Sequence, residues 1–145
     1  MEQVVQRLED AGILDNTYIF YTSDNGYHIG QHRLHPGKEC GFEEDIRVPM
    51  FIRGPGIPVG EEVDFVTTHI DIAPTIFEIA RLNLKEEFDG TPIPLRAREV
   101  EEEKSSKSRH EHVNVEYWGK AGFEGEMSRA RKSLFYYCSC TNCLC

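Results

Sequence analysis

An apolar run at residues 18–22 leads into the tripeptide Asp24-Asn25-Gly26, and this junction most constrains the fold. The run, Tyr-Ile-Phe-Tyr-Thr, is rich in aromatic and β-branched residues, and its near-continuous apolarity is typical of a buried parallel strand. In α/β folds, ligands and metals gather at the carboxyl ends of parallel strands. The sequence therefore predicts a strand over residues 17–22 that delivers Asp24 and Asn25 to a ligand-binding edge of a sheet.

The chemistry of this junction suits a hard cation. A carboxylate and an amide oxygen side by side, here Asp24 and Asn25, are ligands for Ca²⁺ or Mg²⁺. Lys38 follows in the long polar loop over 23–47, and its ammonium would attract an anionic group that shares the metal. Taken alone, Asp-Asn-Gly is also ordinary β-turn chemistry, and Lys38 is equally consistent with a solvated loop lysine. Since Ca²⁺ takes about six to eight oxygen ligands, these residues would supply only part of its shell.

The surrounding pattern predicts alternating helices and strands. A helix is expected over residues 2–11, with Gly12 as its C-cap. A short edge or entry strand is expected over 48–52, because a proline lies near its start. Asp71 is expected to cap a further helix that tolerates Pro74 in its first turn. This order of elements indicates a layered α/β sheet.

The second half of the chain is less regular. We assign residues 1–98 and 111–127 to one partial domain, with a strand expected over 112–118 from its alternating pattern. The charge run within 99–110 is typical of a solvated linker or insert. Residues 128–145 hold four of the five cysteines, in the spacing C-x-C-x₂-C-x-C. This tail could bind a soft metal, but a disordered or aberrant end is the favoured interpretation.

Composition excludes some classes of function. The formal net charge of −9 argues against a nucleic-acid partner, whose phosphates need a basic surface. No stretch of eighteen apolar residues occurs, so no membrane span is expected. The N-terminus has no signal-peptide pattern and opens directly within a helical pattern, which suggests that an upstream portion is missing.

Several segments, in a fixed order, resemble the sulfatase family. The resemblance covers roughly residues 3–127 and is closest to the arylsulfatase and N-acetylglucosamine-6-sulfatase branch. It implies an α/β, alkaline-phosphatase-like sulfatase fold, present here in part, with a layered mixed sheet flanked by helices. The segments that carry it are Ser-Asp-Asn-Gly-Tyr-His-Ile-Gly-Gln-His-Arg (23–33), Gly-Lys (37–38), Glu-Glu-Asp-Ile-Arg-Val-Pro (43–49), Arg-Gly-Pro-Gly (53–56), Thr-His-Ile-Asp-Ile-Ala-Pro-Thr (68–75), Phe-Asp-Gly (88–90) and 112–119.

The resemblance also implies roles for individual residues. Asp24 and Asn25 resemble two protein ligands of the family's divalent cation, generally Ca²⁺, with Mg²⁺ as the alternative. Lys38 resembles the lysine that contacts the sulfate and helps the leaving oxygen. His28 and His32, in the same loop, are expected to face the substrate. The expected substrate is a small-molecule or glycan sulfate ester, and the expected location is secretory, vacuolar or lysosomal.

Two departures from the family pattern bear on activity. The family's nucleophile is a formylglycine made in a C/S-x-P-S/A-R motif, and this sequence has no such motif. The aspartate pair that precedes the motif in the family is also absent. We therefore expect a catalytic domain truncated upstream and a chain that is inactive alone. Two alternatives stay open: a related metal-dependent phosphoester hydrolase with a serine or threonine nucleophile, and a non-catalytic fragment with exposed sheet edges.

Overall fold

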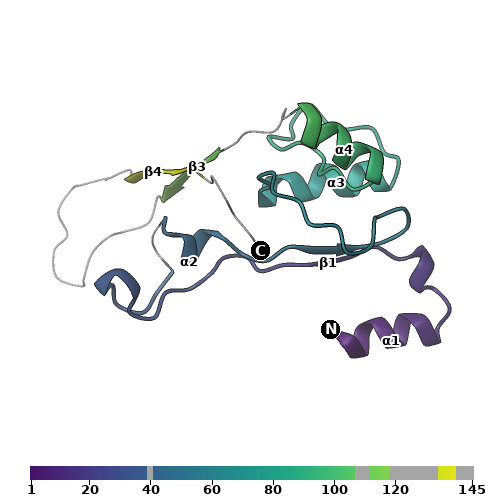
Figure 1. Ribbon diagram of the computed structural model, residues 1–145, viewed down its shortest axis with the longest axis horizontal. Coiled ribbons are helices and arrows are strands. Elements are labelled where there is room, and N and C mark those ends of the chain that lie inside the picture. Colours follow the sequence, from purple (N-terminus) through teal and green to yellow (C-terminus); the bar gives the residue numbers. More distant parts are fainter. Residues whose placement is uncertain (39–40, 107–111, 118–133, 140–145) are drawn as a thin grey trace.

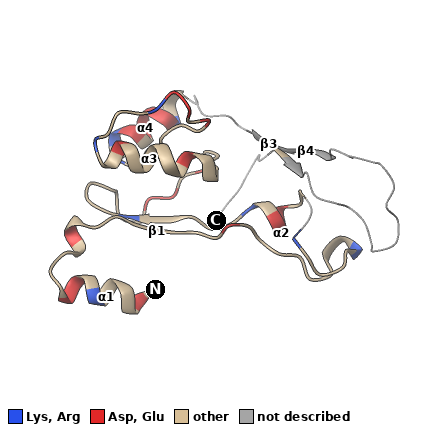
Figure 2. Cartoon of the chain, turned by 180° about the vertical axis from the view of Figure 1, so that it is seen from behind, with Lys and Arg blue, Asp and Glu red and all other residues tan. Residues whose placement is uncertain are grey.

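The computed structural model describes residues 1–38, 41–106, 112–117 and 134–139. Two short strands, β1 (Ile19–Tyr21) and β2 (Phe51–Arg53), pair antiparallel, with Phe20 opposite Ile52. Figure 1 shows α3 and α4 on one side of this ribbon and α1 on the other, and the view from behind in Figure 2 agrees. The arrangement is layered, as the order of elements predicts.

The strand predicted over residues 17–22 is present but shorter, and the expectation of a buried parallel strand is wrong for its pairing with β2. The two strands run antiparallel, and the rings of Tyr21 and Phe51 are exposed neighbours with centroids 6.1 Å apart. An apolar run of aromatic and β-branched residues suits both kinds of ladder, so the pattern could not decide between them.

Helix α1 (Glu2–Asp10) ends where its glycine predicts. Gly12 has a φ of 68°, and its N–H donates to the carbonyl of Glu9 at 2.8 Å. The N–H of Ile13 reaches back to the carbonyl of Leu8 at 3.0 Å, so the last carbonyls of the helix find donors. A 3₁₀ turn, η1 (Leu14–Asn16), then leads into β1.

Helix α3 (Ile72–Ile79) follows a 3₁₀ turn, η3 (His69–Asp71), and Asp71 stands at its N-cap position as predicted, but the Asp71 side chain makes no capping hydrogen bond to α3. The carboxylate of Asp71 accepts the backbone N–H of Thr68 at 2.9 Å, which forms a capping box. Its other oxygen accepts the N–H of Thr91 at 2.9 Å, and the hydroxyl of Thr75 accepts the N–H of Ile93 at 2.8 Å. We call these contacts the Asp71–Thr75 clasp.

The clasp ties the 90–95 segment to α3, and the buried apolar residues lie beside it. Among the described residues these are Ile93, Leu95 and Val100. Val100 belongs to α4 (Ala97–Ser106), so part of the charge run expected as a linker or insert forms a helix. Val100 is the buried residue of α4 among the described residues, and the rest of the helix is largely polar.

The remaining elements are short. Helix α2 (Glu43–Ile46) and the 3₁₀ turn η2 (Gln31–Arg33) lie in the long loop. Strand β3 (His112–Tyr117) confirms the strand expected over 112–118, and it pairs antiparallel with β4 (Leu134–Ser139). This second strand lies in the tail expected to be disordered, whose other residues and Trp118 are outside the described ranges. No helix in those ranges has the length and apolarity to cross a membrane.

Candidate metal site and its supporting loop

The structure brings three of the predicted site residues together. The Nζ of Lys38 lies 3.4 Å from Oδ1 of Asn25 and 3.9 Å from Oδ2 of Asp24. We call Asp24, Asn25 and Lys38 the rim group. The side chain of Asp24 is 81% exposed and that of Lys38 is 55% exposed. A positive charge therefore already faces the two oxygens that the sequence predicts as metal ligands.

Local hydrogen bonds prepare the two ligand oxygens. The amide nitrogen of Asn25 donates to the carbonyl of Gly26 at 2.6 Å, so its Oδ1 is turned toward Lys38. The backbone N–H of Asn25 and, less strongly, the charge of Lys38 lower the pKa of Asp24 below its ordinary value. The carboxylate of Asp24 is thus anionic over a wide pH range.

A carboxylate and an amide oxygen of this kind fit part of the oxygen shell of a Ca²⁺ or Mg²⁺ ion. In the part of the chain that the structure describes, no cluster of three or more His, Cys, Asp or Glu side chains could hold a metal. The rim group would therefore have to share a cation with ligands from elsewhere or with water.

His28, predicted to face the substrate, is buried instead of exposed. Its Nδ1 lies 2.8 and 2.9 Å from the two carboxylate oxygens of Asp45 in α2. His28 is 4% exposed and Asp45 is 3% exposed. In this position the imidazole is held against α2.

His32 lies in a second arrangement on the same loop. Its ring stacks on Phe42 with centroids 4.0 Å apart, and its Nε2 is 3.2 Å from both carboxylate oxygens of Glu44. Glu44 has a lowered pKa because its own backbone N–H and the His32 side chain stabilise the charged form. His32 is partly exposed, so contact with a substrate is compatible with its position and stays a prediction.

Two residues near the rim group were missed by sequence reasoning. One is Asp45, which lies 17 positions after His28 and is one of three consecutive acidic residues. The other is His69, whose Nε2 donates to the carbonyl of Ser23 at 2.7 Å, directly before Asp24. His69 stands within the family-like segment 68–75, which is the one signal that could have drawn attention to it.

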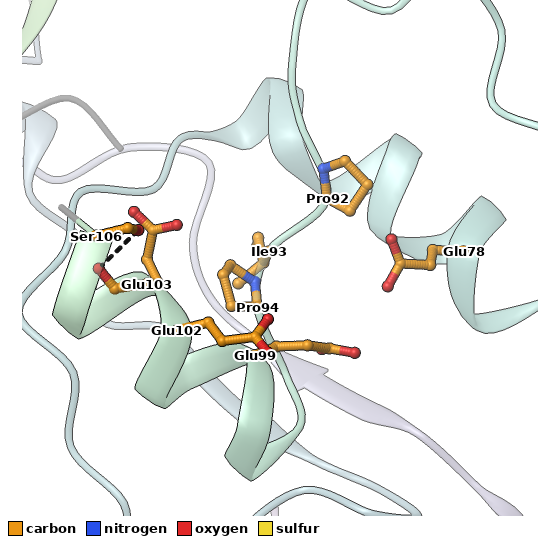
Figure 3. Close-up of a pocket in the computed structure, with 8 residues that line it drawn as sticks. All are labelled: Glu78, Pro92, Ile93, Pro94, Glu99, Glu102, Glu103 and Ser106. Atoms are coloured by element: carbon orange, nitrogen blue, oxygen red, sulfur yellow. Dashed lines mark hydrogen bonds between the residues drawn. The ribbon is translucent and has the colours of Figure 1, made fainter. Parts of the chain in front are cut away.

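A pocket of about 340 Å³ lies elsewhere, between α3 and α4. Figure 3 shows carboxylates from both helices around Ile93 and its flanking prolines. Two of these carboxylates, on Glu78 and Glu99, already pair with Arg96 at 3.8 and 2.7 Å. None of the residues of the rim group lines this pocket. A cluster of acidic side chains is not by itself evidence of a binding site, so we assign the pocket no function.

Comparison with known proteins decides the family. The sulfatase family model matches residues 1–82. This chain belongs to the sulfatase family. A sulfatase of Metarhizium majus is 48% identical over 117 residues, which is 80% of this chain and 28% of that protein. Human N-acetylglucosamine-6-sulfatase is 48% identical over 94 residues, or 64% of this chain and 17% of that protein.

Other sulfatases give the same picture. An arylsulfatase of Chlamydomonas reinhardtii is 42% identical over 144 residues, covering 92% of this chain and 22% of the relative. An extracellular sulfatase homolog of Drosophila melanogaster is 45% identical over 93 residues, which is 64% of this chain and 8% of that protein. The resemblance to the arylsulfatase and N-acetylglucosamine-6-sulfatase branch is confirmed. The chain spans less than a third of each of these relatives, and the family is generally metal-dependent.

The fold class is also confirmed. A protein solved in complex with its substrate, D-glucosamine-2-N,6-O-disulfate, superposes with a TM-score of 0.70 at 24% sequence identity. The match covers 95% of this chain and 26% of that one. The chain thus has part of the alkaline-phosphatase-like sulfatase fold.

Proposed function

We propose that this chain forms part of the catalytic domain of a sulfuric ester hydrolase. In this proposal Asp24 and Asn25 hold a divalent cation, Ca²⁺ or alternatively Mg²⁺, and Lys38 contacts the sulfate. The observation that carries it is the convergence of the Lys38 ammonium on the two candidate ligand oxygens, at 3.4 and 3.9 Å. Membership of the sulfatase family supports the same assignment.

The residues of the rim group have complementary parts. A bound cation would polarise the sulfate oxygens as a Lewis acid. Asp24 supplies the negative charge that draws the cation, and its lowered pKa keeps that charge in mildly acidic conditions. Lys38 can turn from these oxygens to an anion and neutralise charge on the sulfate and on the leaving oxygen.

The family's nucleophile is not among the 145 residues of this sequence. Formylglycine needs a C/S-x-P-S/A-R motif, which the sequence lacks, so the proposal requires that a segment other than these 145 residues supplies it. For the same reason we propose that the chain alone is inactive or nearly so, because one lysine cannot replace a covalent step.

The proposed substrate is a small-molecule or glycan sulfate ester. The names of the relatives support this class, and one structural neighbour is bound to a disulfated glucosamine. A secretory, vacuolar or lysosomal location is proposed because a relative is named as an extracellular sulfatase. Neither argument selects among aryl and sugar sulfates.

The cation part of the proposal is tested by calorimetric titration of the chain with Ca²⁺ in chloride buffer. Asp24→Asn should weaken Ca²⁺ binding about tenfold or more, since affinity follows the charge of the ligands. Asp15→Asn is the matched control, because the Asp15 carboxylate is fully exposed and lies 3.9 Å from Arg53, away from the rim group. Equal losses in both variants would refute a specific site at Asp24.

The reaction class is tested by turnover of a chromogenic aryl sulfate with added Ca²⁺. The chain should be inactive, whereas a longer protein that contains it and a formylglycine motif should hydrolyse the ester. An aryl phosphate in place of the sulfate distinguishes the related phosphoester hydrolase, which would prefer it. Size-exclusion chromatography with a dye for exposed apolar surface identifies a poorly folded fragment.

A further inference from the structure

We propose that His28 is a positioning residue. Its buried contact with Asp45 holds two segments of the loop against α2, the one that carries Asp24 and Asn25 and the one that carries Lys38. This inference rests on the proposed function for its consequence, the binding of a cation, but not for its geometry. It gives His28 a role behind the site instead of at the substrate surface.

The side chains of His28 and Asp45 form a buried, hydrogen-bonded pair. Nδ1 of His28 faces both carboxylate oxygens of Asp45 at 2.8 and 2.9 Å, and both residues are almost wholly buried. Burying a carboxylate is costly unless donors compensate it, so this contact selects one placement of the loop on α2. The ring of Tyr27 stacks alongside, with centroids 6.3 Å apart.

The backbone extends this contact to the rim group. The N–H and C=O of His28 pair with the C=O and N–H of Gly37 at 2.9 and 3.0 Å, and Gly37 directly precedes Lys38. In the segment that carries Asp24 and Asn25, the N–H of Gly26 donates to the carbonyl of Asp45 at 2.8 Å, and Gly26 directly follows Asn25. The pair of His28 and Asp45 is therefore bonded to the neighbours of both Lys38 and Asn25.

The fit against α2 leaves little freedom. A Cβ added at Gly26 would lie 1.9 Å from the carbonyl oxygen of Glu44, which only a glycine avoids. A loop wedged this closely moves as a unit when its anchor is lost. Loss of the imidazole donor should therefore shift the ligand oxygens relative to Lys38, much as loss of an outer-shell partner disturbs metal ligands.

The test compares two substitutions at His28, one that removes the hydrogen-bond donor to Asp45 and one that keeps a donor. His28→Phe keeps a ring beside Tyr27 but removes the donor to Asp45. His28→Asn keeps an amide donor near the position of Nδ1. Asp45→Asn removes the charge without changing size, and it serves if His28→Phe fails to fold. Arg98→Ala, at an exposed ion pair on α4, is the control.

Two readouts are used on the full chain. Amide hydrogen exchange by NMR reports the N–H groups of Gly26 and Gly37, with the amides of α3 as internal reference. Calorimetric titration reports binding of Ca²⁺ alone. His28→Phe should speed exchange at Gly26 and Gly37 about tenfold while α3 is unchanged, and it should weaken Ca²⁺ about tenfold. His28→Asn should restore most of both.

The outcomes separate this inference from the proposed function. Faster exchange by the same factor in α3, or unchanged exchange at Gly26 and Gly37, would overturn the positioning role. If Asp24→Asn does not affect Ca²⁺ binding, the proposed cation site fails, yet the exchange data still decide the role of His28. If Asp24→Asn weakens Ca²⁺ binding and His28→Phe does not, only the present inference fails.

Discussion

Asp71 and Asp24 carry the same carboxylate, and the molecule places them in opposite surroundings. Asp71 is buried and accepts backbone donors from Thr68 and Thr91, so its oxygens bind two segments of the chain to each other. Asp24 is exposed, and its carboxylate contacts the hydroxyl of neighbouring Ser23 and the ammonium of Lys38. The first aspartate is used for folding, and the second is placed so that a ligand can reach it.

The contrast shows how the chain divides stability from function. Removing a buried acceptor leaves backbone donors unsatisfied, which is costly. Removing an exposed carboxylate costs little, because water already solvates it. Strong effects on unfolding should therefore concentrate in the Asp71–Thr75 clasp, and strong effects on cation binding in the rim group.

The largest expected effect is that of Asp71→Ala on stability. The N–H groups of Thr68 and Thr91 lose their acceptor, so the free energy of unfolding should fall by about 3 kcal/mol. Asp24→Ala should leave it almost unchanged, because the side chain is exposed. Urea unfolding followed by circular dichroism measures both, and a larger loss for Asp24→Ala would reverse the comparison.

Two glycines sharpen the comparison at a smaller scale. A Cβ at Gly90 would lie 2.3 Å from the carbonyl oxygen of Ile70, next to the clasp, as one at Gly26 would meet Glu44. Gly90→Ala should lower the free energy of unfolding by about 2 kcal/mol with little effect on Ca²⁺ affinity. Gly26→Ala should weaken Ca²⁺ binding more than any other single-methyl change. An equal loss of Ca²⁺ affinity in Gly90→Ala and Gly26→Ala would contradict the separation between the Asp71–Thr75 clasp and the rim group.

The smallest effect depends on pH and concerns Glu99 at the start of α4. Partial burial opposes ionisation of this carboxyl, but donors from Arg96 and Leu95 outweigh burial and lower its pKa below the ordinary 4.5. Because the folded pKa is depressed, Glu99 stabilises the fold above about pH 4.5, and this contribution is lost as the pH falls through the folded value.

Glu99→Gln keeps an acceptor but removes the charge that Arg96 and the start of α4 stabilise, so the free energy of unfolding should fall by about 0.5 to 1 kcal/mol at pH 7. At pH 3 the difference from the unsubstituted chain should shrink. Thermal unfolding at both values measures it, with exposed Glu86→Gln as control. A difference that grows on acidification would have the wrong sign for a depressed pKa.

Local signals in the sequence predict much of the fold. Gly12 marks the end of α1 because capping depends on a few adjacent residues. Asp71 marks the start of α3, although its carboxylate bonds to Thr68 and Thr91 instead of capping that helix. The parallel pairing expected for the strand over 17–22 is wrong for its pairing with β2, because side-chain type does not encode which strand will lie alongside. Helix α4 was missed, since its anchoring to the core depends on Val100 meeting a segment of the chain that the charge run does not reveal.

The candidate site was foreseen in part. The chemistry of the residues and the resemblance to the sulfatase family both singled out Asp24, Asn25 and Lys38. The structure brings them together, although their chemical roles stay predictions. The contact of His28 with Asp45 could not be predicted, because a 17-residue separation acquires meaning only when the loop folds back on α2. Burial, which converts a polar loop histidine into an anchor, is a property of the folded chain.

The most direct test of the rim group as a shared cation and anion site is calorimetric titration of the chain with sulfate, with and without Ca²⁺. Lys38→Met is the decisive variant, because it removes the ammonium but keeps an unbranched side chain of nearly the same length. The account predicts that Ca²⁺ tightens sulfate binding about tenfold in the unsubstituted chain and not in the Lys38→Met chain, since the anion must be held by both charges. Equal enhancement in both chains, or none in the unsubstituted chain, would contradict it.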